Sequence, residues 1–372
     1  MRAARATNSR FYFDAALLFP ALLLTGIGVV MVYSASSHIA AERFGDGSYF
    51  LKKQAAFALA GFCMMIVCRY LSYRILRFLA YFILAASFLL LAMVLVSSLG
   101  YEANGATRWL RLAGFSFQPS VFAKFALIVY LAYSLNKKKE DMNRFSVGFL
   151  PHLVVFGVFS GLILMQPDFG SVVIFGVITW LMLFVAGVRL THLLTTFMFF
   201  LPAGLYYLLS AEYRIKRLTS FLNPWQFKDG SGYQIVHSYM AFGTGGIWGT
   251  GLGQGYQKLF YLPEPHTDFI FSVIGEELGL WGVLFILLLY GILMWRGVII
   301  AMKSRDRFGA LLALGLTVAI GFQVFVNTGV TVGILPTKGI TLPFLSYGGT
   351  SLLFNLVAVG VLMNIGQRSH ED

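Results

Sequence analysis

The sequence predicts an all-α fold, a polytopic bundle of about ten transmembrane helices, and two observations support this prediction. Hydrophobic residues make up 58% of the 372 residues, and charged residues make up only 12%. The charged share is about half of that in a soluble globular protein, and the mean hydropathy is +0.75. A single core surrounded by water could not bury this much apolar surface. Most of the chain is therefore expected to lie in a lipid bilayer.

The individual spans are predicted from runs of about twenty mainly apolar residues, the length that a helix needs to cross the hydrocarbon core. The first run follows Arg2, Arg5 and Arg10 and has no small-residue cleavage site directly after it. It is therefore expected to be a retained span, not a removed signal peptide. No internal repeat is evident, and a single membrane domain over 1–372 is expected. The ten runs lie near 15–37, 54–70, 78–99, 119–135, 148–166, 169–187, 191–210, 269–295, 308–335 and 345–366.

Lysine and arginine residues indicate the orientation of the bundle, because they accumulate in cytoplasmic segments. With a cytoplasmic amino terminus, sixteen of them fall in cytoplasmic segments and six fall in the short outer loops. Both termini are therefore expected in the cytoplasm. The long connection 211–268, between the seventh and eighth spans, is then extracellular, and a connection of this length is usually functional or mobile.

The net charge of +12 and the pI of about 9.7 do not indicate a nucleic-acid-binding protein. The basic residues lie mainly in short breaks between apolar runs, which fits anchoring against anionic lipid. Cys63 and Cys68 lie within one apolar run. Neither a disulfide nor a metal site is expected from them.

Residues 243–258 form a glycine-rich run, GTGGIWGTGLGQGYQK, in the long outer connection. Such runs can bind phosphate through their backbone N–H groups. The spacing, however, matches neither a dinucleotide-binding motif nor a Walker A motif. It favours a flexible loop, and a phosphate-binding loop stays open as the alternative.

Asp268 stands at the start of the eighth span. Its carboxylate could cap the helix, or it could act as a general base at the water-exposed mouth of a cavity. Glu276 lies roughly 80° around the helix and about 12 Å further along it, and Glu277 points to the opposite side. These two acids are expected to cap polar groups on neighbouring helices, not to pair with Asp268. Gly275 and Gly279 form a small-xxx-small pair that lets another helix pack closely.

Three further features lie at membrane depth or near the outer face. Lys124 lies inside the fourth span, where it needs a counter-charge, a snorkelling route or a polar cavity. Asp168 lies in the tight outer turn between the fifth and sixth spans, and capping of that turn is its expected role. Prolines and glycines punctuate the connection between the last two spans, which predicts irregular backbone beside a cavity, close to Asp268.

Five motifs along the chain are more specific together than any is alone. They are RWLRLAGFSFQPS from Arg108, QPDFGS from Gln166, GYQIVHS from Gly232, LPEPHTDFIFSVIGEELG from Leu262 and LPFLSYGGTS from Leu342. In this order they resemble the SEDS family of bacterial wall-synthesis proteins (shape, elongation, division and sporulation), over about residues 15–366. The stretch PTKGITLPFLSYGGTS resembles the division branch, FtsW, more than the elongation branch, RodA. The spore-cortex member SpoVE stays an alternative.

The resemblance implies a peptidoglycan glycosyltransferase that polymerises lipid II, a disaccharide-pentapeptide on undecaprenyl pyrophosphate. The β-1,4 glycan strands would form at the outer face of the bacterial cytoplasmic membrane, for septal or lateral wall synthesis. A single-pass class B penicillin-binding transpeptidase is the implied partner, together with divisome or elongasome proteins. No cofactor is certain, although a divalent cation, Mg²⁺ or Mn²⁺, is a possible helper. A lipid II flippase and a non-catalytic scaffold for the transpeptidase are the alternatives.

The resemblance also implies roles for particular residues. The family's essential acid maps onto Asp268, the expected base for the attacking sugar hydroxyl. Arg217 is the favoured ligand of the pyrophosphate, and no residue is assigned as a metal ligand. The other substrate-binding candidates are Arg108, Lys124, Arg214, Lys216, His266, Lys338 and Ser346.

One position departs from the family pattern. The motif FQPS is commonly followed by Glu, then two residues and Lys, whereas here Val121 occupies the acidic position and Lys124 remains. Lys124 is therefore expected either to find another acid or to contact the substrate pyrophosphate directly.

Overall fold

The computed structural model describes residues 14–96, 100–103, 106–112, 115–260 and 262–371, so Arg2, Arg5 and Arg10 lie outside the described residues. Its long helices are α2 (Ala15–Phe44), α3 (Tyr49–Tyr70), α4 (Arg74–Val96), α5 (Pro119–Lys137), α6 (Leu150–Met165), α7 (Phe169–Val185), α8 (Leu190–Leu209), α12 (Ile270–Lys303), α13 (Arg307–Thr331) and α14 (Gly349–Glu371). Each predicted span overlaps one of them, which confirms the helix bundle.

Eight helical segments within the described residues are long and apolar enough to cross a membrane, and α7 is a shorter apolar helix. The number of crossings and the single domain therefore stay predictions. Several helices extend beyond the apolar runs, as α12 does to Lys303, because a helix continues through polar residues outside the hydrocarbon core.

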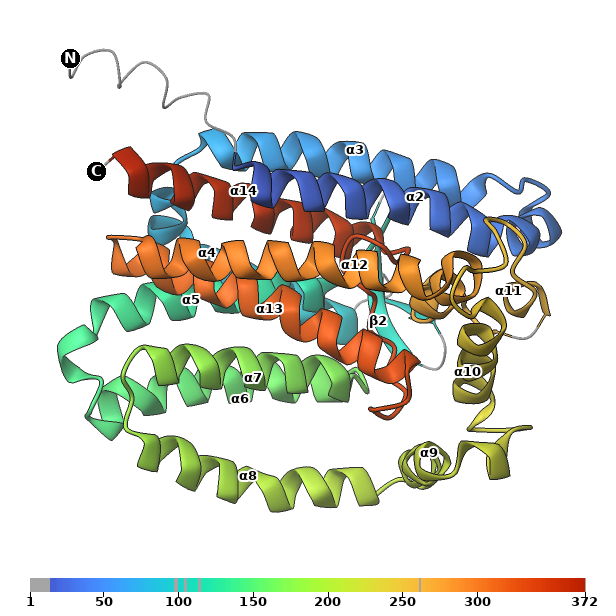
Figure 1. Cartoon of the computed structure of the whole chain (residues 1–372). Helices are drawn as coiled ribbons and strands as arrows, with labels where there is room; N and C mark the ends of the chain where they lie inside the picture. The colour runs from blue at the N-terminus through green and yellow to red at the C-terminus, as the bar shows by residue number, and fades with distance from the viewer. Residues whose placement is uncertain (1–13, 97–99, 104–105, 113–114, 261, 372) are drawn as a thin grey trace, which may run out of the picture.

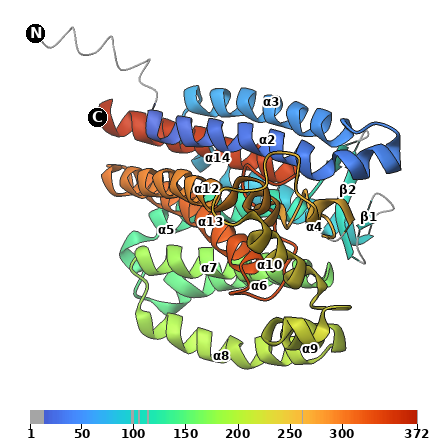
Figure 2. The ribbon, with the colours of Figure 1, turned by 45° about the vertical axis from the view of Figure 1, so that its right-hand side comes forward.

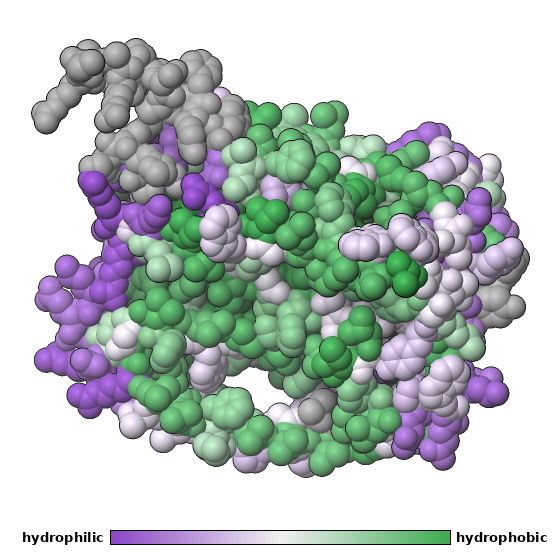
Figure 3. Space-filling view, viewed as in Figure 1, coloured by the Kyte–Doolittle hydropathy of each residue, from purple (hydrophilic) through white to green (hydrophobic). Residues whose placement is uncertain are grey.

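The two ends of the bundle differ from its middle. The start of α2 and the end of α14 lie at the same end of the bundle (Figures 1 and 2), as expected for two termini on one side of a membrane. The space-filling view shows an apolar band between two more polar ends (Figure 3). Such a band is the surface that a bilayer requires. At the centre lie α5, α13 and α14, in which most residues of the apolar segment are buried.

A small antiparallel sheet follows α4, where the all-α prediction had placed an outer loop. It consists of β1 (Gly100–Ala103), β2 (Ala106–Leu112) and β3 (Phe115–Phe117), in the order β1-β2-β3. Leu110 of β2 pairs with Phe117 of β3 and is fully buried. These strands are too short to give a hydropathy signal, yet they hold Arg108 beside the turn between α6 and α7, where its guanidinium donates to the carbonyl of Gln166.

The connection 211–268 is largely folded. It carries α9 (Glu212–Leu222), the 3-10 helix η4 (Pro224–Phe227), α10 (Tyr233–Gly245) and α11 (Gln257–Phe260). At Gly275 of α12 the ring of Phe242 in α10 packs where a Cβ would stand, as the small-residue spacing predicts.

The glycine-rich run is bound to the first turns of α12. Thr250 N–H donates to the carbonyl of Glu276 at 2.9 Å, and Tyr256 N–H donates to the Glu276 carboxylate at 2.8 Å. A Cβ at Gly249 would lie 2.2 Å from the carbonyl oxygen of Glu277, so only glycine permits this approach. The prediction of a flexible loop is therefore wrong, and these two N–H groups donate to the backbone and the side chain of Glu276, which leaves neither free for a phosphate.

Candidate functional site

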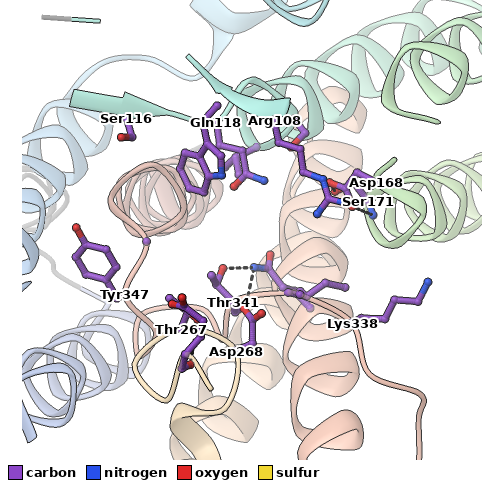
Figure 4. A pocket seen from close by; sticks show the side chains of 18 of the residues that line it. Arg108, Ser116, Gln118, Asp168, Ser171, Thr267, Asp268, Lys338, Thr341 and Tyr347 are labelled. Atoms are coloured by element: carbon purple, nitrogen blue, oxygen red, sulfur yellow. Dashed lines mark hydrogen bonds between the residues drawn. The ribbon is translucent and has the colours of Figure 1, made fainter. Parts of the chain in front are cut away.

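A cavity of about 940 Å³ opens where β2, the start of α5, the loop before α12 and the irregular segment between α13 and α14 meet. Figure 4 shows Asp268 at this cavity, with Arg108, Asp168 and Lys338 on one side and Tyr347 on the other. The polar and charged side chains that line it include Arg43, Lys53, Arg108, Gln118, Lys124, Asp168, Arg217, Glu264, Asp268, Gln323, Lys338, Thr341 and Tyr347.

Asp268 lies in the loop that leads into α12. Phe269, not Asp268, is the N-cap residue of α12, and that helix has no side-chain cap hydrogen bond. Asp268 therefore does not cap α12, and it lines the cavity instead. The backbone of Asp268 is held by Asn327, whose Nδ2 donates to the Asp268 carbonyl oxygen at 2.9 Å.

The pKa of Asp268 is raised to about 7, first by burial and then by the nearby carboxylate of Glu264, whereas Arg108 acts to lower it. A base that titrates near neutral pH is well matched to general-base work. The pKa of the neighbouring His266 is lowered to about 4 by burial and by Arg43, so this imidazole is neutral at pH 7.

A basic cluster shares the cavity with Asp268 and extends into an adjoining cavity, and it is formed by Arg108 of β2, Arg214 and Arg217 of α9, and Lys338. Arg108, Arg217 and Lys338 line both the main cavity and an adjoining one of about 110 Å³, which Arg214 also lines. The pKa of Lys338 falls to about 8, through burial first and then the positive charge of Arg217. So many cations in one place are suited to a multiply charged anion such as a pyrophosphate.

Lys124 reaches the same cavity from α5, and its ammonium donates to Gln323 Oε1 at 2.6 Å. The partner is thus a neutral amide on α13, not the acid that the sequence suggested as one option. Val121 also lines the cavity, where the family pattern would place an acid.

Three of the sequence-predicted binding residues line neither of the two cavities. Lys216 is exposed and pairs with Glu212 at 2.8 Å. His266 is buried against the rings of Phe50 and Tyr347. Ser346 is buried too, and its Oγ accepts the N–H of Leu342 at 2.7 Å. These three side chains make contacts within the protein, and their part in substrate binding stays a prediction.

Asp168 fulfils the predicted capping role and also lines the cavity. Its Oδ1 accepts the N–H of Ser171 at 3.2 Å, which caps α7, and its Oδ2 accepts the Ser171 hydroxyl at 2.6 Å. Arg43, Lys53 and Gln323 were not singled out from the sequence, although a glutamine inside an apolar span could have marked the last of them.

Comparisons with known proteins agree with this arrangement. A family model described as "Cell cycle protein", that of FtsW, RodA and SpoVE, matches residues 15–371. The chain belongs to this family. It is 50% identical over 353 residues to a probable peptidoglycan glycosyltransferase FtsW of Trichlorobacter lovleyi, covering 95% of this chain and 93% of that protein. It is 44% identical to the stage V sporulation protein E of Bacillus subtilis, with 96% and 97% covered.

Solved structures show the same fold. One, described as a peptidoglycan synthase complex that coordinates polymerization and crosslinking, matches with a TM-score of 0.80 and 31% identity, over 97% of this chain and 100% of that one. The rod shape determining protein RodA of Thermus thermophilus matches with a TM-score of 0.71 and 30% identity, over 97% and 99%.

Proposed function

We propose that this chain is a peptidoglycan glycosyltransferase that polymerises lipid II into β-1,4 glycan strands at the outer face of the cytoplasmic membrane. The observation that carries the proposal is the pairing of Asp268, whose pKa is about 7, with a basic cluster across one cavity. Related proteins bear the name of this activity. The sequence identity of 50% between this chain and an FtsW protein favours a role in septal wall synthesis.

The chemistry needs one displacement with inversion at the anomeric carbon, from an α-linked pyrophosphate to a β-linked glycan. The Asp268 carboxylate accepts the proton of the attacking sugar hydroxyl, and the hydroxyl oxygen forms the new bond to the anomeric carbon. The bond to the pyrophosphate oxygen breaks with its electron pair. Arg108, Arg217 and Lys338 then stabilise the negative charge of the leaving group.

The adjoining cavity suggests a path for the lipid tail of the substrate. It combines basic Arg214 and Arg217 with apolar Phe169 of α7 and Leu209 of α8. Figure 3 shows an opening through the molecule on the side where Figure 1 places α8. A pyrophosphate at the basic residues would let the polyprenyl chain pass between these helices into the bilayer.

The divalent cation stays a prediction. Within the described ranges, no group of three or more His, Cys, Asp or Glu residues could hold a metal ion. The protein side chains of this region do not form a metal centre by themselves, and no step above is assigned to a cation. A class B penicillin-binding transpeptidase is the proposed partner, in line with the synthase complex of similar fold.

Purified protein in detergent micelles separates the enzyme from the flippase and the scaffold. We expect lipid II to be converted to glycan strands, visible as a ladder on a gel, when the protein is supplied with its transpeptidase. A micelle has no two sides, so a flippase would produce nothing there. Absence of polymer in the presence of the transpeptidase would contradict the enzyme and favour the flippase or the scaffold.

A further inference from the structure

Helix α13 buries two amide side chains one turn apart, Gln323 and Asn327, with exposures of 4% and 2%. Polar groups are costly in membrane-spanning helices, where each needs a partner. Gln323 lines the cavity, and Asn327 lies one turn further along the same helix. The chemistry described above assigns neither of them a role.

Asn327 joins two segments that are distant in the sequence. Its Nδ2 donates to the carbonyl oxygen of Asp268 at 2.9 Å and to that of Ile340 at 2.6 Å. Both partners are carbonyl oxygens, which only accept, so the orientation of the amide is fixed. One side chain therefore ties the backbone of Asp268 to the irregular segment between α13 and α14.

Gln323 makes the corresponding link on the next turn. Its Nε2 donates to the carbonyl oxygen of Thr341 at 2.8 Å, and its Oε1 accepts the Lys124 ammonium at 2.6 Å. The adjacent carbonyls of Ile340 and Thr341 are thus held by two side chains of one helix face. Asp268 and Lys124 are fixed relative to the same two carbonyls.

We propose that Gln323 and Asn327 are positioning residues for glycan synthesis. Asn327 fixes the backbone of Asp268 so that the carboxylate faces the acceptor hydroxyl. Gln323 holds the Lys124 ammonium at the cavity. It thereby takes over the part of the acid that the family commonly has at position 121, where this chain has Val121. The inference rests on the proposed function and names two residues that support its site.

The segment between α13 and α14 has other anchors that would keep it folded without Asn327. Tyr290 Oη donates to the carbonyl of Pro343, and Tyr347 N–H donates to the carbonyl of His266 at 2.8 Å. Loss of Asn327 would therefore release the Asp268 backbone without detaching the whole segment. A misplaced base costs rate, because the reacting atoms must lie within a narrow range of geometry.

The test compares Asn327→Ala and Asn327→Asp with Asn364→Ala in the lipid II polymerisation assay, using the full chain with its transpeptidase. Asn364 is a matched control, since it is 4% exposed and bonds the backbone of Arg69 and Tyr73 away from the cavity. Both Asn327 variants are expected to lower kcat about 100-fold with KM for lipid II unchanged, and Asn364→Ala is expected to leave kcat per folded protein unchanged.

Gln323→Leu gives the second arm. Without Gln323 Oε1 the Lys124 ammonium is no longer held at the cavity, and its contact with the substrate pyrophosphate is lost. KM for lipid II is therefore expected to rise about tenfold, the effect of one lost charge-assisted contact, with kcat retained. Asn327→Ala at wild-type kcat, or a loss equal to that of Asn364→Ala per folded protein, would overturn the role of Asn327. An unchanged KM for Gln323→Leu would overturn that of Gln323. A wild type that makes no polymer would instead contradict the proposed function.

Discussion

Single residues determine the chemistry that this site can perform. The Asp268 carboxylate has a pKa of about 7 in the cavity that it shares with the basic cluster, and Lys338 in that cluster has a pKa of about 8. From the sequence motifs, Asp268 was predicted as the base and Lys338 as a substrate-binding residue. The motifs did not predict Gln323, Arg43 or Lys53, because only tertiary folding brings these side chains to the same cavity.

The two pKa values predict a bell-shaped dependence of the polymerisation rate on pH. Below about pH 7 Asp268 is protonated and cannot accept the hydroxyl proton, so the rate rises with pH through that value. Above about pH 8 Lys338 loses its charge, and the rate falls. In Lys338→Arg the alkaline limb is expected to move upward, because an arginine stays protonated, while the acid limb stays near 7.

Initial rates of lipid II polymerisation across this pH range check the prediction. Lys216→Arg is the control, because Lys216 is exposed and pairs with Glu212 outside the cavity, and its profile should match the wild type. An alkaline limb that does not move in Lys338→Arg would show that another group controls it.

Among the elements, the glycine-rich run and α12 make contacts that the sequence did not predict. The acids Glu276 and Glu277 were expected to cap polar groups on neighbouring helices, and Glu277 does accept a hydrogen bond from the Ser34 hydroxyl of α2. Both acids also accept hydrogen bonds from backbone N–H groups of the glycine-rich run, which was not expected. Composition could not reveal this packing, because a glycine-rich sequence is compatible both with a flexible loop and with a tightly packed one. Lys258 at the end of the run forms a buried ion pair with Glu277.

Lys258→Met is expected to lower the free energy of unfolding by about 3–5 kcal/mol, since it leaves Glu277 buried without its counter-charge. Adding Glu277→Gln should restore much of the loss, because a neutral amide no longer needs that charge. Thermal unfolding in detergent measures both. Lys52→Met, which breaks the exposed ion pair with Asp46, is the control and should change little. An unchanged midpoint for Lys258→Met would contradict the structural role of this pair.

The whole molecule follows the outline that hydropathy and charge predicted. A helix lies at each predicted span, and the start of α2 and the end of α14 share one end of the bundle (Figure 1). Hydropathy could not give the sheet β1–β3 or the fold of 211–268, since strands and short helices at a membrane surface lack a long apolar run. Yet these parts carry Arg108 and Arg217 to both cavities and Arg214 to the adjoining one.

The most direct test of the account is the initial rate of lipid II polymerisation by Asp268→Asn, beside the wild type and the control Asp141→Asn. Asp141 pairs with Arg144 in the connection between α5 and α6, so the control should polymerise at the wild-type rate. Asp268→Asn keeps the size of the side chain and removes the base, and the rate is expected to fall about 10²- to 10⁴-fold. Glycan strands formed by Asp268→Asn at the wild-type rate would contradict the account.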